Sequence, residues 1–258
     1  MHAHEKIGVA INKARDDGRT ALIPFVTAGY PQLETFIETL AAISTIGDVV
    51  EIGVPFSDPM ADGMTIQRSC HAAIQNGVSL KWIFEQLDSA VGKINAPLVL
   101  MSYINPLMAF GYESLAARSF DAGVCAFIVP DLPLEESNEL RVALEAKGIG
   151  LIQLVTPATP DDRIKKLADA SRGFLYAVTI TGITGGSNGL GDDLSSYLDK
   201  VSGASKVPVC AGFGIREAAD VATVGQHAAG AIVGSALVEV LERNEDPAAF
   251  LRSLSGDN

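Results

Sequence analysis

Short apolar runs alternate with longer amphipathic segments along the whole chain. In the first unit, "TALIPFVTAG" is an apolar run ending in glycine, and "YPQLETFIETLAAISTIG" after it repeats apolar residues at helical spacing. Similar apolar runs recur as "VVEIGVP", "PLVLMSYI", "CAFIVPD", "GLIQLVTP", "GFLYAVTI", "VPVCAGFG" and "GAIVGSA". Helical patterns follow them over 69–94, 113–121, 135–147, 160–171, 192–203, 216–228 and 236–243. The pattern therefore predicts eight strands, each followed by a helix.

The strand runs are continuously apolar, which is typical of a parallel sheet covered on its outer face. Eight β/α units in a chain of 258 residues are the usual content of a (β/α)8 TIM barrel. An open doubly wound sheet is the alternative, but it usually has fewer strands, and no GxGxxG follows the first one. We predict a single barrel domain over 1–258. It includes an extra N-terminal helix in "HEKIGVAINKARDDG", before the first strand.

Composition narrows the class of protein. A net charge of −12, with no basic run, argues against a nucleic-acid partner. The sequence shows neither a signal peptide nor an apolar stretch long enough to span a membrane, so we expect a cytoplasmic protein. Three cysteines without a CxxC motif indicate neither a disulfide framework nor a zinc site.

In a TIM barrel, chemistry takes place where the strands end and in the loops that follow them. No lysine falls at such a position, which makes a Schiff-base mechanism improbable. His71 follows the second loop and is a weak candidate, although a solvated helix residue is the simpler interpretation. What remains at the strand ends is carboxylates, hydroxyls and backbone amides.

Glycine-rich turns follow the last two strands, in "AGFGIRE" and "VGSALVE". Backbone N–H groups in such turns and at helix N-termini bind phosphate, and many barrels hold a phosphate at these two positions. Glycine that merely allows a tight turn is the alternative for either turn alone. Both turns together, beside "TGITGG" after strand six, favour a phosphate site. The glycine-rich segment 180–193 lies next to it and is expected to act as a lid.

The stretch "EIGVPFSDPMADG", residues 51–63, places three carboxylates at and after the end of the second strand. Burial there would raise the pKa of Glu51 and prepare it for proton transfer, whereas a hydrogen-bonded structural acid is the alternative. Asp58 precedes Pro59 and can simply begin a turn. Without a catalytic Lys, His or metal cluster, Glu51 and Asp62 are the expected acid/base pair.

The motifs resemble a known family. "EIGVPFSDPMADGMTIQ", "PFVTAGYP", "YINP", "PDLPLEE", "YAVTITGITG" and the two glycine turns are similar, in order and spacing from about residue 23 to 236, to the alpha subunit of tryptophan synthase. The resemblance implies a carbon–carbon lyase of tryptophan biosynthesis that cleaves indole-3-glycerol phosphate to indole and glyceraldehyde 3-phosphate. The resemblance also implies that this subunit needs no cofactor for the reaction.

The resemblance also implies roles for residues. Glu51 would transfer protons at indole C3 and at the glycerol hydroxyl, Asp62 would contact the indole N–H, and Tyr176 would lie near Glu51. The implied substrate-binding residues are Phe25, Tyr103, Thr184, Gly185, Phe213, Gly214, Gly234 and Ser235.

A partner is implied as well: a beta subunit that carries pyridoxal phosphate, in an alpha2beta2 heterotetramer. The loop 55–62, with Pro55 and Asp58, and the lid would face it. Two residues depart from the family pattern. Met64 stands where proline is usual and Thr179 where serine is usual, and either change could alter loop closure.

Two rival functions remain open. A metal-assisted lyase would bind Mg²⁺ through Glu51, Asp62 and Asp131 beside a phosphosubstrate. Alternatively, a non-catalytic member would bind the phosphoester and only regulate its partner. Neither lysine nor metal is needed for the retro-aldol reaction, because a C3-protonated indole accepts the electrons itself.

Overall fold

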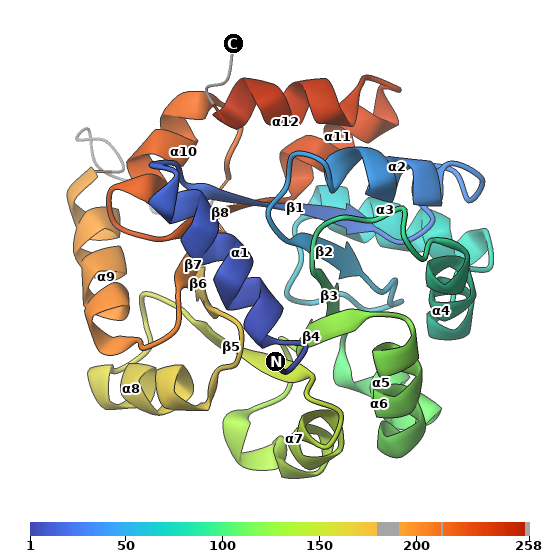
Figure 1. Ribbon diagram of the computed structural model, residues 1–258, viewed down its shortest axis with the longest axis horizontal. Helices are drawn as coiled ribbons and strands as arrows, with labels where there is room; N and C mark the ends of the chain where they lie inside the picture. The colour runs from blue at the N-terminus through green and yellow to red at the C-terminus, as the bar shows by residue number, and fades with distance from the viewer. Residues whose placement is uncertain (180–190, 213, 256–258) are drawn as a thin grey trace.

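All eight strands close into one parallel barrel in the order β1-β2-β3-β4-β5-β6-β7-β8 (Figure 1). The computed structural model describes residues 1–179, 191–212 and 214–255, and no side chain of 191–193. The barrel confirms the fold class predicted from the alternating pattern. Its strands are β1 Ala21–Thr27, β2 Val50–Gly53, β3 Leu98–Met101, β4 Val124–Ile128, β5 Gly150–Val155, β6 Leu175–Val178, β7 Val209–Gly212 and β8 Gly230–Val233.

Helices cover the barrel, most of them as an outer ring (Figure 1). They are α1 Glu5–Asp16, α2 Phe36–Ile43, α3 Met64–Gln75, α4 Leu80–Ser89, α5 Ile104–Phe110, α6 Tyr112–Asp121, α7 Asn138–Glu145, α8 Asp161–Ala170, α9 Gly191–Ala204, α10 Ala218–Gly225, α11 Ser235–Glu242 and α12 Pro247–Ser255, with a 3₁₀ turn, η1, at Leu134–Glu136. Between them and the strands lies a continuous apolar core, to which both layers contribute.

The helical pattern over 69–94 was expected to be one element, and the structure divides it into α3 and α4. Gly77 has a φ of +84°, a left-handed conformation that ends α3 at no steric cost. Ser79 then begins α4, because its side chain accepts a hydrogen bond from the Trp82 amide at 3.2 Å. Two helices, α5 and α12, were not predicted from the sequence pattern. The latter packs against α2, α10 and α11 and so belongs to the outer ring.

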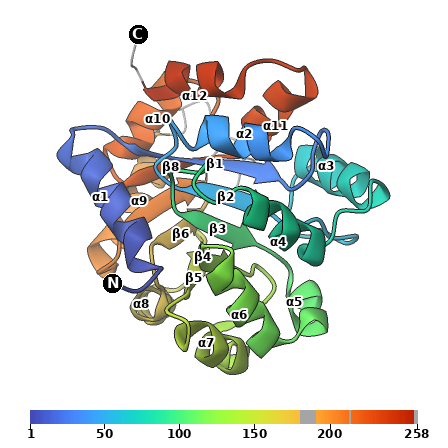
Figure 2. The same cartoon turned by 45° about the vertical axis from the view of Figure 1, so that its right-hand side comes forward.

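The predicted N-terminal helix, α1, lies across one end of the barrel rather than in the outer ring (Figures 1 and 2). Its buried face consists of Ile7, Ile11 and Ala14, which belong to one apolar cluster with residues of the strands. With this end covered, the opposite end, where every parallel strand finishes, is left to hold a site. None of the described helices combines the length and the apolar character needed to cross a membrane.

Candidate active site

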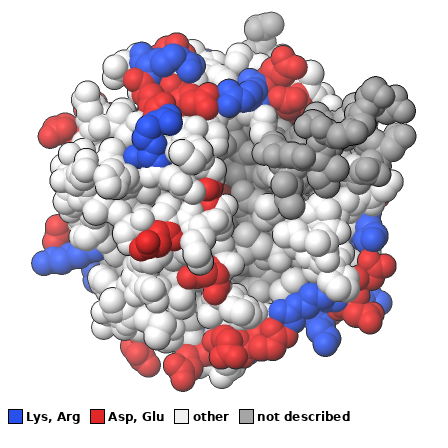
Figure 3. Space-filling view, turned by 180° about the vertical axis from the view of Figure 1, so that it is seen from behind, with Lys and Arg blue, Asp and Glu red and all other residues white. Residues whose placement is uncertain are grey.

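A cavity of about 230 Å³ lies at the carboxyl ends of the strands. The face opposite α1 is hollowed at its centre, with acidic side chains beside the hollow (Figure 3). Several residues expected to form a site line this cavity: Phe25, Glu51, Asp62, Tyr176, Gly214, Gly234 and Ser235. The barrel therefore brings these expected residues, which come from five of its eight β/α units, into one concave space.

Glu51 occupies the middle of the barrel wall, with Phe25 of β1 and Val99 of β3 as its register partners. Its residue surface is 1% exposed, and its Oε2 atom has no hydrogen-bond partner within the described residues. Burial, followed by the negative charge of Asp62, raises the pKa of Glu51 to about 8. At neutral pH this carboxyl group is therefore mostly protonated, and it can donate a proton into the cavity.

Asp62 lies on the loop between β2 and α3 and is fixed there by its neighbours. Its Oδ2 accepts a hydrogen bond from the Tyr103 hydroxyl at 2.9 Å, and its main-chain oxygen accepts one from Gln67 Nε2 at 2.8 Å. Burial raises the pKa of Asp62, while the bond from Tyr103 acts in the opposite direction by favouring the carboxylate.

Tyr103 has a different position from the one expected. It does not line the cavity but stands behind Asp62, where it also accepts the Ala61 amide at 2.9 Å and stacks on Phe56 with ring centroids 5.0 Å apart. Its hydroxyl thus joins β3 to the Asp62 loop. The sequence showed the tyrosine at a strand end but not which loop it holds.

Tyr176 projects from β6 toward the ends of its neighbouring strands. A Cβ atom added to Gly212 of β7 would lie 2.4 Å from the Tyr176 hydroxyl, so only glycine leaves room for this ring. Burial, then the charges of Glu51 and Asp62, raise the pKa of Tyr176 well above its usual value. The phenol therefore remains protonated and can act as a hydrogen-bond donor.

The two glycine turns meet at the cavity. Gly214 follows β7 with a φ of +29°, and Gly234 immediately precedes Ser235, the first residue of α11. The first N–H groups of a helix have no partner within the helix, and the helix dipole adds positive potential there. A Cβ atom at Gly234 would have its nearest neighbour, Phe25, at 3.9 Å, so the space above this turn is open.

Some expected site residues cannot be placed. Thr184, Gly185 and Phe213 lie outside the described residues, as does the expected lid up to Gly191, where α9 begins. Thr179, the last described residue before that segment, donates its hydroxyl hydrogen to the Gly212 oxygen at 2.9 Å.

The residues expected at a partner surface differ in exposure. Asp58 is exposed on the β2–α3 loop and accepts a hydrogen bond from the Ser57 hydroxyl at 2.6 Å, whereas Pro55 is buried. Two apolar side chains on the same segment face solvent: Met60 is 86% exposed and Met64 is 76% exposed.

Sequence reasoning missed other parts of the lining. Met101, Leu154 and Ile232 face the cavity from strand ends, and the alternation of inward and outward positions could have indicated them. It also missed Arg216, two residues after Gly214, although a cation directly after a glycine turn was a usable signal.

The acids expected in a magnesium site are not gathered together. Asp131 is absent from the cavity lining and accepts the Ile104 amide at 2.9 Å, at the beginning of α5. Within the part of the chain that the structure describes, no three His, Cys, Asp or Glu residues are grouped as a metal site requires. The arrangement instead combines a carboxyl with a raised pKa, a second acid, and a glycine turn at the beginning of α11.

Known proteins are similar to this chain in sequence and in fold. The family model described as tryptophan synthase alpha chain matches residues 11–254. The tryptophan synthase alpha chain of Roseiflexus sp. (strain RS-1) is 42% identical over 250 residues, which cover 94% of this chain and 96% of that protein. The alpha chain of Bacillus cereus (strain AH820) is 42% identical over 246 residues, covering 94% and 95%.

Solved structures agree. The tryptophan synthase subunit alpha of Legionella pneumophila str. Paris superposes with a TM-score of 0.87 at 29% identity, covering 99% of this chain and 97% of that one. Tryptophan synthase from M. tuberculosis, in an aminoacrylate-bound form, gives 0.86 at 31% identity, covering 97% and 98%. These matches confirm the resemblance and do not favour either rival function. The chain belongs to the tryptophan synthase alpha chain family, whose members are lyases that act on indole-3-glycerol phosphate.

Proposed function

We propose that this cavity cleaves indole-3-glycerol phosphate to indole and glyceraldehyde 3-phosphate, with Glu51 as the proton-transferring residue and Asp62 as its electrostatic partner. The observation that supports this proposal most directly is the state of Glu51. Its carboxyl group is buried, its pKa is about 8, and one of its oxygens has no hydrogen-bond partner among the described residues. A structural acid would have its oxygens paired, whereas a catalytic acid needs one directed at its substrate.

The proton transfers balance. Neutral Glu51 donates its proton to indole C3, which makes the ring a cation whose N–H faces the Asp62 carboxylate. The Glu51 carboxylate then takes the proton of the glycerol hydroxyl next to the scissile bond. As that hydroxyl becomes a carbonyl, the C–C electron pair returns to the ring. Indole and the aldehyde leave, and Glu51 is protonated again.

Other residues support these steps. Tyr176, whose phenol stays protonated, would donate a hydrogen bond to the Glu51 carboxylate when it forms. Phe25 and the other apolar lining residues would exclude water from the indole side of the cavity. The electrostatic interactions of Glu51 and Asp62 with the substrate would be stronger there as a result. Gly214, Gly234 and Ser235 would hold the phosphate through backbone amides, together with Thr184, Gly185 and Phe213 from the part of the chain not described.

The family implies a beta subunit as partner, and we propose an alpha2beta2 assembly in which the beta subunit carries pyridoxal phosphate. The exposed loop with Asp58 and Met60 is the proposed contact, and buried Pro55 would stiffen it. Because the indole ring takes up the electrons, we assign no cofactor to this chain. The cytoplasm is the proposed location.

The test is indole formation from indole-3-glycerol phosphate by the purified chain, with and without a beta subunit, for wild type and Glu51→Gln. The isosteric amide cannot transfer a proton, so we expect kcat to fall by at least about a thousandfold while the binding of glycerol 3-phosphate is kept. Near-normal turnover by the variant would remove Glu51 from the mechanism. Activity lost to EDTA and restored by Mg²⁺ would favour the metal-assisted alternative.

A further inference from the structure

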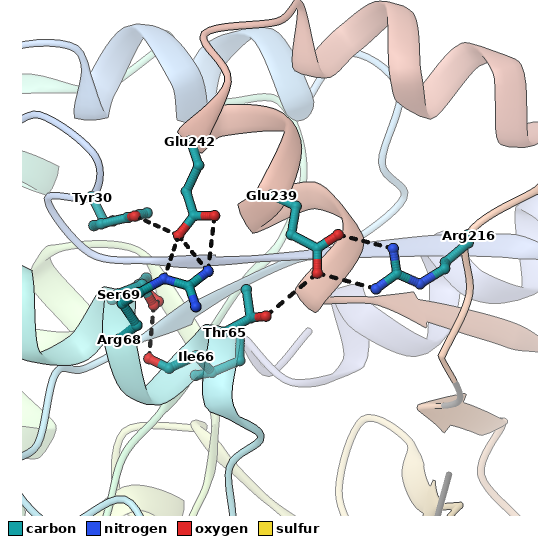
Figure 4. Close-up of polar contacts among 9 residues, drawn as sticks. Tyr30, Thr65, Ile66, Arg68, Ser69, Arg216, Glu239 and Glu242 are labelled. Carbon is teal, nitrogen blue, oxygen red and sulfur yellow. Dashed lines mark hydrogen bonds and ion pairs between the residues drawn. The ribbon is translucent and has the colours of Figure 1, made fainter.

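Two carboxylates on α11 each hold an arginine from a different loop or helix (Figure 4). Glu242 binds Arg68 of α3, and Glu239 binds Arg216, which follows β7. The two pairs have similar chemistry and exposure, since the arginine side chains are 57% and 60% exposed. The difference that bears on a ligand is that Arg216 lines the cavity, and Arg68 does not.

The position of Arg216 is set by the two phosphate turns. It lies two residues after Gly214, and its own amide donates to Asp220 Oδ2 at 2.8 Å, which fixes the backbone there. Glu239 is one helical turn after Ser235, so both residues are on the same face of α11. The ion pair, at 2.8 and 3.1 Å, therefore holds the guanidinium beside the first turn of this helix.

The charges of the residues that line the cavity indicate a role for Arg216. The described lining contains two acids, Glu51 and Asp62, and Arg216 is the one cation among those residues. A phosphate dianion entering a chain of net charge −12 gains from a fixed positive charge, because the local field acts over distances at which remote charges are screened.

The Arg216 guanidinium has N–H donors that its ion pair with Glu239 does not use. Two of its five N–H groups bind Glu239, and the other three make no hydrogen bond within the described residues. Glu239 also keeps other partners, since it is 25% exposed and its Oε1 lies 3.4 Å from the Thr65 hydroxyl. Arg216 can therefore contact an anion without leaving a buried carboxylate unpaired.

We propose that Arg216 is a phosphate-binding residue of this site, held at the cavity rim by Glu239 and contacting the phosphate that the Gly214 and Gly234 turns receive. The inference deepens the proposed function, on which it rests for the identity of the phosphoester. It adds a charged side chain to a site otherwise attributed to backbone amides. Glu239 positions the arginine and, as an anion, also weakens phosphate binding.

The experiment measures binding rather than turnover, so that it is separate from the test of cleavage. Calorimetric Kd values are compared for glycerol 3-phosphate and for indole, which lacks a phosphate. We expect Arg216→Gln to raise the Kd for glycerol 3-phosphate about ten- to one-hundredfold and leave that for indole within about twofold. The KM for the full substrate should rise similarly with little change in kcat.

Two further variants give the contrast. Arg68→Gln removes the matched arginine outside the cavity and should leave both Kd values unchanged. Glu239→Gln removes both the group that positions the arginine and a charge that repels phosphate, so we expect it to change the glycerol 3-phosphate Kd less than Arg216→Gln does. The proposal is overturned if Arg216→Gln leaves the glycerol 3-phosphate Kd unchanged or weakens indole equally, or if Glu239→Gln weakens phosphate as much as Arg216→Gln. Should Arg216→Gln not fold, Arg216→Lys, which keeps the charge but loses the planar fork, is expected to show an intermediate Kd.

Discussion

The hydroxyl of Tyr103 donates to Asp62 at 2.9 Å and accepts the Ala61 amide at the same distance, so one phenol fixes both the acid and the loop that carries it. Because Tyr103 is only 5% exposed, water does not replace it without rearrangement. The loop that carries Asp62 is thus held by a residue that follows β3, a strand that contributes no proposed catalytic residue.

Tyr103→Phe tests this relationship. Loss of the hydrogen bond leaves the Asp62 carboxylate less stabilised, and its already raised pKa should rise further. We expect kcat/KM to fall about tenfold at pH 7, and more steeply below it, since the acidic limb of the pH profile shifts upward. An unshifted acidic limb would mean that Asp62 does not act as a carboxylate in the reaction.

Glu51 should also make folding stability depend on pH. Its pKa is about 8 in the folded chain, above the ordinary value of 4.5, so the native state binds the extra proton between these values and stability falls as pH rises. The destabilisation is fully developed above pH 8 and amounts to at most about 5 kcal/mol. Glu51→Gln removes it.

The measurement is the difference in denaturant-derived unfolding free energy between Glu51→Gln and wild type at pH 5, 7 and 9. We expect the variant to gain on wild type steadily as pH increases. A constant difference would show that Glu51 titrates near its ordinary pKa, and the argument for a neutral proton donor would be lost.

The periodic parts of the chain were predictable and the junctions were not. Continuous apolar runs identified all eight strands, and the run "VVEIGVP" correctly indicated that Glu51 lies on a buried strand. The division of 69–94 depended on Gly77 taking a left-handed conformation, which hydrophobic period does not report. The contacts of Tyr103 with Asp62 and of Arg216 with Glu239 were not predicted, because the partners come from different β/α units and no local pattern encodes such a contact.

Gly234 offers a test of the phosphate turn. Its φ of −105° lies outside the left-handed range, and a Cβ atom would be 3.9 Å from Phe25, so Gly234→Ala and Gly234→Asp form a matched pair that differs only beyond the Cβ atom. The methyl group occupies part of the space and should raise KM about tenfold or less. The carboxylate opposes the phosphate directly and should raise it more than about a hundredfold. Equal effects would indicate that volume, not charge, governs this position.

Asp62→Asn separates two contributions of one acid. Its charge is the second cause of the raised pKa of Glu51, after burial, so the neutral amide should lower that pKa only in part. The pH dependence of stability should therefore persist in Asp62→Asn, with its midpoint moved to lower pH. Cleavage should fall at least about a hundredfold, because the indole cation loses its counter-charge while Glu51 still carries a proton below its pKa. The test measures the unfolding free energy as a function of pH and kcat on the same preparation. A variant that unfolds would show that Asp62 is structural. A variant that keeps full kcat would show that the Asp62 carboxylate does not stabilise the indole cation.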